Sequence, residues 1–215
     1  VIVLSGKSGL TVGAEKAWKY CEERGIPRIF FINKVDDERV NYQGVLQQLK
    51  DKYGKKIAPF QLPMREGEKI TGFINVVEQE ARKFDGDRTV TAEMPEGMEN
   101  ELLPLREMIN EAVAETSEEL MDKYFSGEAF TLPEMYEALR NGVAAGDVVP
   151  VLCGSAYHKL GISSLMNAIH AYFPAPNSKD EFVIGKKKDG SESRLKIDVS
   201  DPLSALVFKT VADPY

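Results

Sequence analysis

The 215-residue sequence has few of the side chains that most often carry out chemistry, with two cysteines, two histidines and one tryptophan. Cys21 and Cys153 have no metal-ligand spacing and each falls beside an apolar run, which indicates reduced, structural thiols. His158 and His170 have no evident cysteine or carboxylate partner at ligand spacing, so both are expected to be solvated or half-buried. We therefore expect no metal site in this chain.

The sequence also lacks a long apolar run and an excess of positive charge. No apolar stretch approaches the roughly 20 residues that a membrane helix needs, and the N-terminus has no signal-peptide pattern, so a soluble, cytoplasmic protein with no membrane partner is expected. A formal net charge of −7 argues against direct nucleic-acid binding, because that affinity comes mostly from Lys and Arg. The acidity is local: residues 54–146 carry 10 Lys and Arg against 19 Asp and Glu, whereas the remainder carries 17 against 15.

Three short apolar runs have the pattern of buried strands in a parallel sheet. They are residues 1–4 (VIVL), 28–32 (RIFFI) and 148–152 (VVPVL). A polar turn and then a helical pattern follow each run, and the helix after the first one is expected to end at Arg24, with Gly25 beyond it. Repeated strand-helix units of this kind predict a doubly wound α/β sheet, which we assign to residues 1–53 and 147–176.

Residues 54–146, between the second and third runs, are far more than one crossover helix uses, so they predict an inserted α+β subdomain. Strands are expected at 61–64 and 70–77, with a hairpin at 84–90 around a DG turn, and helices at 98–125 and from Thr131 onward. Residues 177–215 are expected to form a linker, with a turn at 186–190, and the start of a second domain whose first strand is 202–211.

The tetrapeptide NKVD, Asn33 to Asp36, follows the second predicted strand directly, where an open α/β sheet binds its ligands. The Asp36 carboxylate can accept hydrogen bonds from both N1–H and the 2-amino group of guanine, whereas adenine has neither donor. A mismatch of this kind can discriminate by about 10⁴ or more. Asn33 can bridge base and protein, and the stem of Lys34 can pack on the base plane. The alternative interpretation is a turn that caps the next helix.

A second candidate, CGSA at 153–156, follows the third predicted strand. Its small residues allow the backbone to approach a ligand closely, and the Ala156 amide could donate to guanine O6 while rejecting an adenine amino group. Taken alone, this tetrapeptide is a generic turn between a strand and a helix. Beside NKVD in the same sheet, Ser155 and Ala156 predict the other half of a guanine pocket.

Read in order, NKVD, the long insertion, VPVLCGSA, a helix closing at YFPAP and DPLSALVFKTVADPY resemble the guanine-binding half of the G domain of elongation factor G. The insertion, including EAVAETSEELMDKYFSGE at 111–128, resembles the G′ subdomain of that family. The resemblance implies part of a P-loop GTPase sheet with an inserted α+β subdomain and the first strand or strands of a β-barrel domain.

The resemblance also implies a translational GTPase that binds the ribosome and drives translocation. Asn33, Lys34 and Asp36 would read the base of GTP or GDP, with Ser155 and Ala156 completing the pocket. The acidic insertion would contact the ribosomal stalk protein, although a solvated acidic face is the alternative. Other possibilities are a ribosome-protection or recycling factor of the same family, and a protein-interaction module with a vestigial nucleotide pocket.

In this family the P-loop, switch I and the DxxG of switch II precede the strand at which the chain begins. We therefore expect a fragment that contains no catalytic residues and does not hydrolyse GTP, with Mg²⁺ bound only in the parent protein.

The stretch SGKSG at 5–9 looks like the end of a P-loop, but GxxxxGK[ST] requires glycine at position 1, and that residue is Val1. An ATP-dependent kinase built on this stretch is thereby disfavoured, and Lys7 is expected to be exposed rather than bound to phosphate. Where the family usually has Asp-Ala and later Pro-Gln, this chain has Ser5-Gly6 and Val12-Gly13, which indicates a divergent paralogue.

Overall fold

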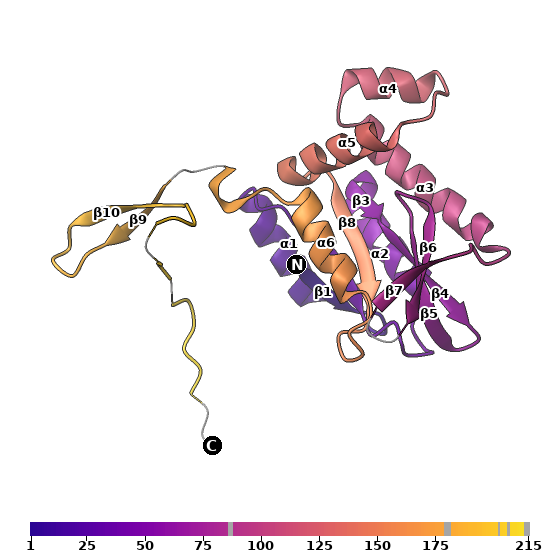
Figure 1. The fold of residues 1–215 in the computed structure, drawn as a ribbon, viewed down its shortest axis with the longest axis horizontal. Helices are drawn as coiled ribbons and strands as arrows, with labels where there is room; N and C mark the ends of the chain where they lie inside the picture. Colours follow the sequence, from indigo (N-terminus) through magenta and orange to yellow (C-terminus); the bar gives the residue numbers. More distant parts are fainter. Residues whose placement is uncertain (86–87, 179–181, 202, 206, 213–215) are drawn as a thin grey trace. The chain divides into compact units, whose positions relative to one another are not determined.

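The computed structural model describes residues 1–85, 88–178, 182–201, 203–205 and 207–212. The chain divides into two compact units, Val1–Phe173 and Pro174–Tyr215 (Figure 1). The first unit contains the predicted α/β sheet and the predicted insertion.

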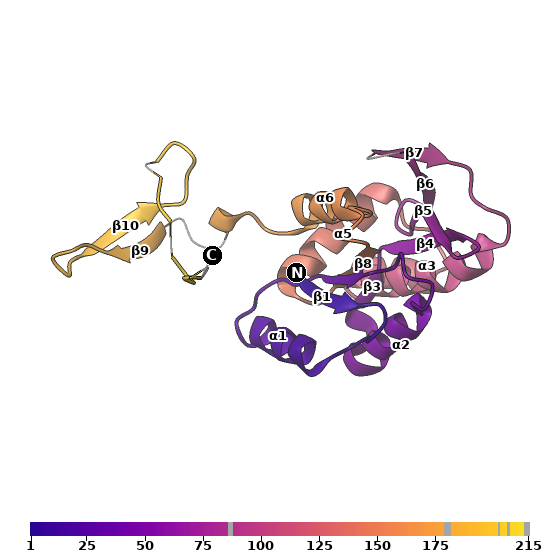
Figure 2. The same cartoon turned by 90° about the horizontal axis from the view of Figure 1, so that it is seen from below.

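A four-stranded parallel sheet forms the centre of the first unit. In spatial order its strands are β1 (Ile2–Ser5), β2 (Phe30–Asn33), β8 (Val149–Gly154) and β3 (Ile57–Pro59). Helices α1 (Val12–Glu23) and α2 (Tyr42–Tyr53) lie on one face of the sheet, and α6 (Ile162–Tyr172) lies on the other (Figure 2). The predicted α/β class, its three strands and the end of α1 at Arg24 are confirmed.

Strand β3 was not predicted, because three residues are too few to show a period of two. It follows a single 3-10 turn, Gly54–Lys56, and pairs with β8 at the edge of the parallel sheet. Residues 57–59 therefore belong to that sheet, although the sequence placed them in the insertion.

Strand β1 departs from the expected buried run. Ile2 and Leu4 are buried, whereas Val1 and Val3 are 56% and 58% exposed. The alternation arises because successive side chains of a strand point to opposite faces of the sheet, and only the face with Ile2 and Leu4 is covered at β1.

An antiparallel sheet forms the first part of the insertion. Its strands, in order, are β4 (Gln61–Glu66), β5 (Lys69–Asn75), β6 (Glu80–Asp85) and β7 (Arg88–Ala92). The predicted strands and the hairpin pairing of β6 with β7 are confirmed, and residues 86 and 87 of the predicted DG turn lie outside the described residues. A register shift between Met64 and Arg65 bends β4.

The prediction of one helix over 98–125 is wrong. Two helices, α3 (Met98–Ala114) and α4 (Glu118–Phe125), occupy this range, followed by α5 (Leu132–Ala145). The break is local: the Thr116 hydroxyl donates to the Val113 carbonyl, and the Ser117 hydroxyl accepts the Leu120 amide as the N-cap of α4. The predicted capping box of Thr131 and Glu134 is confirmed at the start of α5.

The second unit contains a short 3-10 turn, Pro176–Ser178, and an antiparallel hairpin of β9 (Phe182–Lys186) and β10 (Glu192–Lys196), whose tip is the predicted turn at 186–190. The predicted strand at 202–211 is wrong for the described residues 203–205 and 207–211, which form no ladder. Val207 and Phe208 are 81% and 91% exposed there, and a strand requires a paired neighbour to satisfy its backbone.

Candidate functional site

The NKVD and CGSA loops lie next to each other because β2 and β8 are neighbouring parallel strands, with Asn33 opposite Gly154. The Ala156 amide donates to Asn33 Oδ1 at 2.9 Å, across 123 residues of sequence. The Val35 amide donates to the Gly154 carbonyl at 3.1 Å. Both loops extend from the carboxyl ends of their strands, the edge at which open α/β sheets bind ligands.

The Asn33 side chain and the Lys34 backbone set the shape of the first loop. Asn33 Oδ1 also accepts the Lys34 amide at 2.8 Å, so the end of the Asn33 side chain that remains to donate to a ligand is Nδ2. Lys34 has a φ of 67°, the left-handed region that non-glycine residues rarely adopt. This backbone is strained, which is common where a surrounding structure holds a binding loop in place.

The Asp36 side chain is partly exposed, and His158 Nε2 lies 3.6 Å from its Oδ2. The sequence indicated no carboxylate partner for His158, and the structure supplies one because the two loops meet. His158 follows Tyr157, which is 90% exposed, with the two rings in a perpendicular arrangement 4.9 Å apart. A ligand that donates hydrogen bonds to Asp36 must therefore compete with His158 for the carboxylate, or share it.

Ser155 and Ala156 have hydrogen-bond partners within the two loops. Ser155 is 1% exposed, and it pairs with Leu160 through two backbone hydrogen bonds of 3.0 and 2.9 Å. Its hydroxyl accepts the His158 amide at 3.4 Å, so the side chain shapes the loop from inside. The Ala156 amide is already donated to Asn33, so a contact with guanine O6 requires it to be shared or released.

Charged side chains contact the first loop, one from within the loop and two from other elements, and the sequence alone did not indicate these contacts. The Lys7 ammonium pairs with the Asp37 carboxylate, which also accepts the Arg39 guanidinium at 3.1 Å. The Arg39 hydrogen bond, and then that of Lys7, lower the pKa of Asp37 well below its usual range. Arg65 of β4 donates to the carbonyls of Val35 and Asp37. Lys7 lies at the surface, as expected, but it is paired there.

Strand β4 also supports the second loop, through Gln61. Where β3 ends at Pro59, the Phe60 amide still donates to the Val151 carbonyl at 2.9 Å. Gln61 Oε1 then accepts a hydrogen bond from the Cys153 amide at 3.2 Å. Beyond the end of β3, this side chain therefore takes the place of a strand backbone beside β8. Cys153 is fully buried and unpaired, and burial raises the pKa of its thiol well above the usual value, as expected for a structural thiol.

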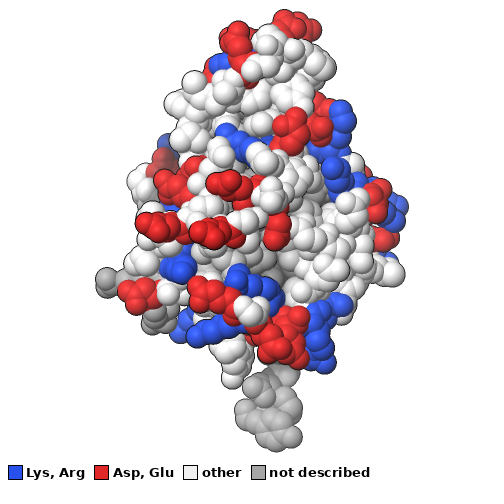
Figure 3. Space-filling model, turned by 90° about the vertical axis from the view of Figure 1, so that its right-hand side faces the viewer, with Lys and Arg blue, Asp and Glu red and all other residues white. Residues whose placement is uncertain are grey.

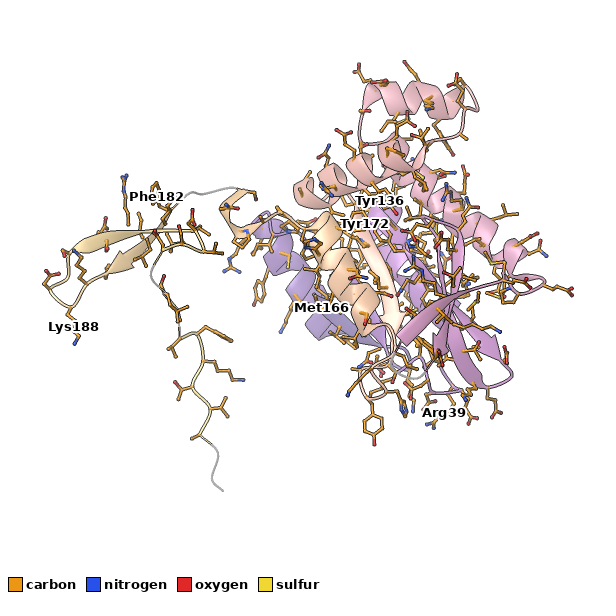
Figure 4. The ribbon with its side chains drawn as sticks, viewed as in Figure 1. Arg39, Tyr136, Met166, Tyr172, Phe182 and Lys188 are labelled. Carbon is orange, nitrogen blue, oxygen red and sulfur yellow. The ribbon has the colours of Figure 1, made fainter. Side chains whose placement is uncertain are left out.

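A separate cavity of about 410 Å³ lies between α5, α6 and strands β5 and β6. Tyr136 and Tyr172 line it, with stacked rings whose centroids are 6.3 Å apart (Figure 4). The Tyr136 hydroxyl donates to the Glu78 carboxylate, and burial together with this bond raises the pKa of Tyr136 to about 12. The hydrogen bond joins α5 to the turn that follows β5 in the antiparallel sheet.

Over the described ranges, no group of three or more His, Cys, Asp or Glu side chains is placed to hold a metal ion. Within the same part of the chain, no helix is long and apolar enough to cross a membrane.

Residues 1–175 match the protein family described as the elongation factor Tu GTP binding domain. The fold is also similar to the crystal structure of a protein from Thermus thermophilus, with a TM-score of 0.76 and 30% sequence identity. That match covers 84% of this chain and 27% of the other, so this chain spans about a quarter of the length of the solved protein.

Proposed function

Since this chain belongs to the translational GTPase family of the elongation factor Tu GTP binding domain, we propose that it carries the guanine-reading part of a GTPase of the elongation factor G type. The observation that supports this proposal is the hydrogen bond from the Ala156 amide to Asn33 Oδ1. It joins the two loops that were predicted together to read guanine, and Asp36 lies in the first of them.

In this proposal the base is bound edge-on between the two loops. Asp36 accepts N1–H and the 2-amino group, and Asn33 Nδ2 donates to N7. The aliphatic stem of Lys34 covers one face of the ring. Charge-assisted hydrogen bonds to a carboxylate contribute about 1.5–3 kcal/mol each, enough for roughly ten- to a hundredfold discrimination per bond.

The substitution Asp36→Asn tests this assignment. The Asn side chain presents one acceptor and one donor in place of two acceptors. The variant should therefore lose affinity for GDP and gain affinity for xanthosine diphosphate, whose base has a 2-oxo group in place of the 2-amino group. We expect the ratio of the two dissociation constants to change by about tenfold or more. Asp122→Asn, on the exposed side of α4, is the matched control. Equal binding of ADP and GDP by the unmodified chain would contradict the proposal.

We also propose that the chain by itself does not hydrolyse GTP and that the parent protein uses GTP with Mg²⁺. Phosphoryl transfer requires a phosphate cradle, Mg²⁺ ligands and a group that positions water. The sequence has no GxxxxGK[ST] motif for such a cradle, while it has the residues proposed to contact the base. Binding of a fluorescent GDP analogue should accordingly be weak, and measurable turnover or sub-micromolar affinity would contradict this view.

The acidic insertion is proposed to bind the ribosomal stalk protein, which places the parent protein on ribosomes in the cytoplasm. On the face that includes α3, Asp and Glu side chains gather in several clusters, with Lys and Arg between them (Figure 3). Glu115 is already bonded to Lys55 at 2.8 Å, whereas Glu118 and Glu119 at the start of α4 are exposed. A partner that presents Lys or Arg would contact Glu118 and Glu119, since both are exposed.

Charge reversal of Glu118 and Glu119 should weaken capture of purified stalk protein and reduce the salt dependence of binding. The same reversal of Glu192 and Asp201 in the second unit is the control.

Exposed apolar side chains on α3 and α4, Leu103 at 66% and Phe125 at 78%, favour a second candidate, a protein-interaction module with a vestigial nucleotide pocket. Stalk binding without any guanine preference would support that module over the GTPase. A ribosome-protection or recycling role is a further alternative within the family.

A further inference from the structure

The loop between β1 and α1, which contains the P-loop-like stretch at residues 5–9, packs directly against the NKVD loop. The Gly6 amide donates to the Asn33 carbonyl at 2.8 Å. A side chain at Gly6 would collide with Val40, since a Cβ there would lie 2.6 Å from Val40 Cγ1. Lys7 follows at once and pairs its ammonium with Asp37. The stretch that resembles a phosphate cradle is thus a support for the neighbouring loop.

We propose that Lys7 is a positioning residue for guanine recognition, which it serves by anchoring Asp37 and thereby the orientation of Asp36. The proposal rests on the guanine site described above. It gives the lysine of SGKSG a role in base selectivity, and no contact with phosphate is involved.

The backbone of the loop explains why Asp37 controls Asp36. The Asp37 amide donates to the Lys34 carbonyl at 3.1 Å, which closes a four-residue turn with Asp36 at its third position. The turn begins at the strained φ of Lys34. A strained turn keeps one conformation only when its surroundings hold both ends. Asn33 holds the first end through Gly6 and Ala156, and Asp37 is the other end.

The Lys7 side chain ties the Asp37 carboxylate to the loop that follows β1. Arg39 also binds that carboxylate, but it is two residues away in the same loop, and its side chain is 71% exposed (Figure 4). Arg39 therefore moves with the loop. Arg65 reaches the loop from β4, and its contacts are with main-chain carbonyls. The side chains of Lys7 and Asp37 are only 35% and 22% exposed, so their pair is partly shielded from water.

The test compares the affinities of GDP and inosine diphosphate, which lacks the 2-amino group and therefore one hydrogen bond to Asp36. The unmodified chain should prefer GDP by about tenfold or more. Lys7→Met should lower the ratio of the GDP affinity to the inosine diphosphate affinity by about three- to fivefold, which is the range of a partly exposed ion pair. Lys7→Arg should restore this ratio. Lys16→Met on the exposed side of α1 is the matched control and should leave the ratio unchanged.

A merely structural role for Lys7 would weaken GDP and inosine diphosphate equally, or lower the unfolding midpoint without changing the ratio. Asp37→Asn provides a second route: it should lower the ratio as Lys7→Met does, and the double variant should be no worse than Asp37→Asn alone. An unchanged ratio in Lys7→Met, in a chain that prefers GDP, overturns this inference alone. Absence of any preference in the unmodified chain overturns the guanine site and the inference with it.

Discussion

Gly154, the last residue of β8, offers a direct test of how the second loop is built. A Cβ at this position would lie 2.2 Å from the Leu160 carbonyl oxygen and 2.7 Å from the edge of the Phe31 ring. The first contact is with backbone, so no side-chain rotation can relieve it. The Leu160 carbonyl accepts the Ser155 amide, and the added methyl group must push these two loop ends apart.

We expect Gly154→Ala to lower the free energy of unfolding by about 2–4 kcal/mol. Overpacking a well-packed site costs about 1–3 kcal/mol, and loss of the one hydrogen bond from the Ser155 amide to the Leu160 carbonyl adds about 1 kcal/mol. The same shift should loosen the Ala156 to Asn33 contact and weaken GDP binding.

Urea denaturation monitored through Trp18, the single tryptophan, measures the first effect. Gly13→Ala is the matched control, because the nearest atom to its Cβ would be Thr11 Oγ1 at 3.9 Å. Alanine there lies within α1 and should be neutral or stabilising by up to about 1 kcal/mol. If Gly154→Ala stays within about 0.5 kcal/mol of the unmodified chain, the range of a neutral surface change, the placement of Leu160 against β8 is refuted.

Arg28 is 3% exposed, with its guanidinium 3.8 Å from the centre of the Trp18 ring, and burial lowers its pKa. Because a buried charge carries a desolvation cost, Arg28→Met should stay within about 1 kcal/mol of the unmodified chain, while Arg28→Ala should lose about 2–3 kcal/mol in urea denaturation. The Lys123 ammonium, with help from Thr131, lowers the pKa of Glu134 from 4.5 to about 2. Its stabilisation is complete above pH 4.5 and disappears as the pH falls towards 2, so the stability gap between the unmodified chain and Glu134→Gln should close over that window.

Much of the α/β sheet could be predicted from local patterns. The runs at 28–32 and 148–152 became β2 and β8, because near-continuous apolar sequence of this length suits a strand covered on both faces. The capping box at Thr131 depends only on residues three apart, and it was confirmed for the same reason. The predicted helix at 98–125 failed because an apolar stripe can continue across a break, and the stripe outweighed the capping signal of Ser117.

The residues of the proposed guanine site were indicated by the chemistry that short motifs carry, since Asn33 and Asp36 follow the carboxyl end of a strand, the edge at which open α/β sheets bind ligands. Three features depended on the tertiary structure. Lys7 and His158 meet the NKVD loop only because β1, β2 and β8 lie side by side. Gly154 was interpreted as room for a ligand, and the structure shows that the chain's own Leu160 carbonyl takes that room.

The sequence by itself determined which hydrogen-bonding groups follow the strand ends, because these groups belong to residue types and strand ends are marked by hydrophobic pattern; the proposed guanine site is built from them. It also determined that the acidity lies in the middle of the chain. The tertiary structure alone decided which side chains hold those groups in place. Ion pairs such as Lys7 with Asp37, and hydrogen bonds such as Ala156 with Asn33, join residues 30 and 123 positions apart, and only folding brings them within bonding distance.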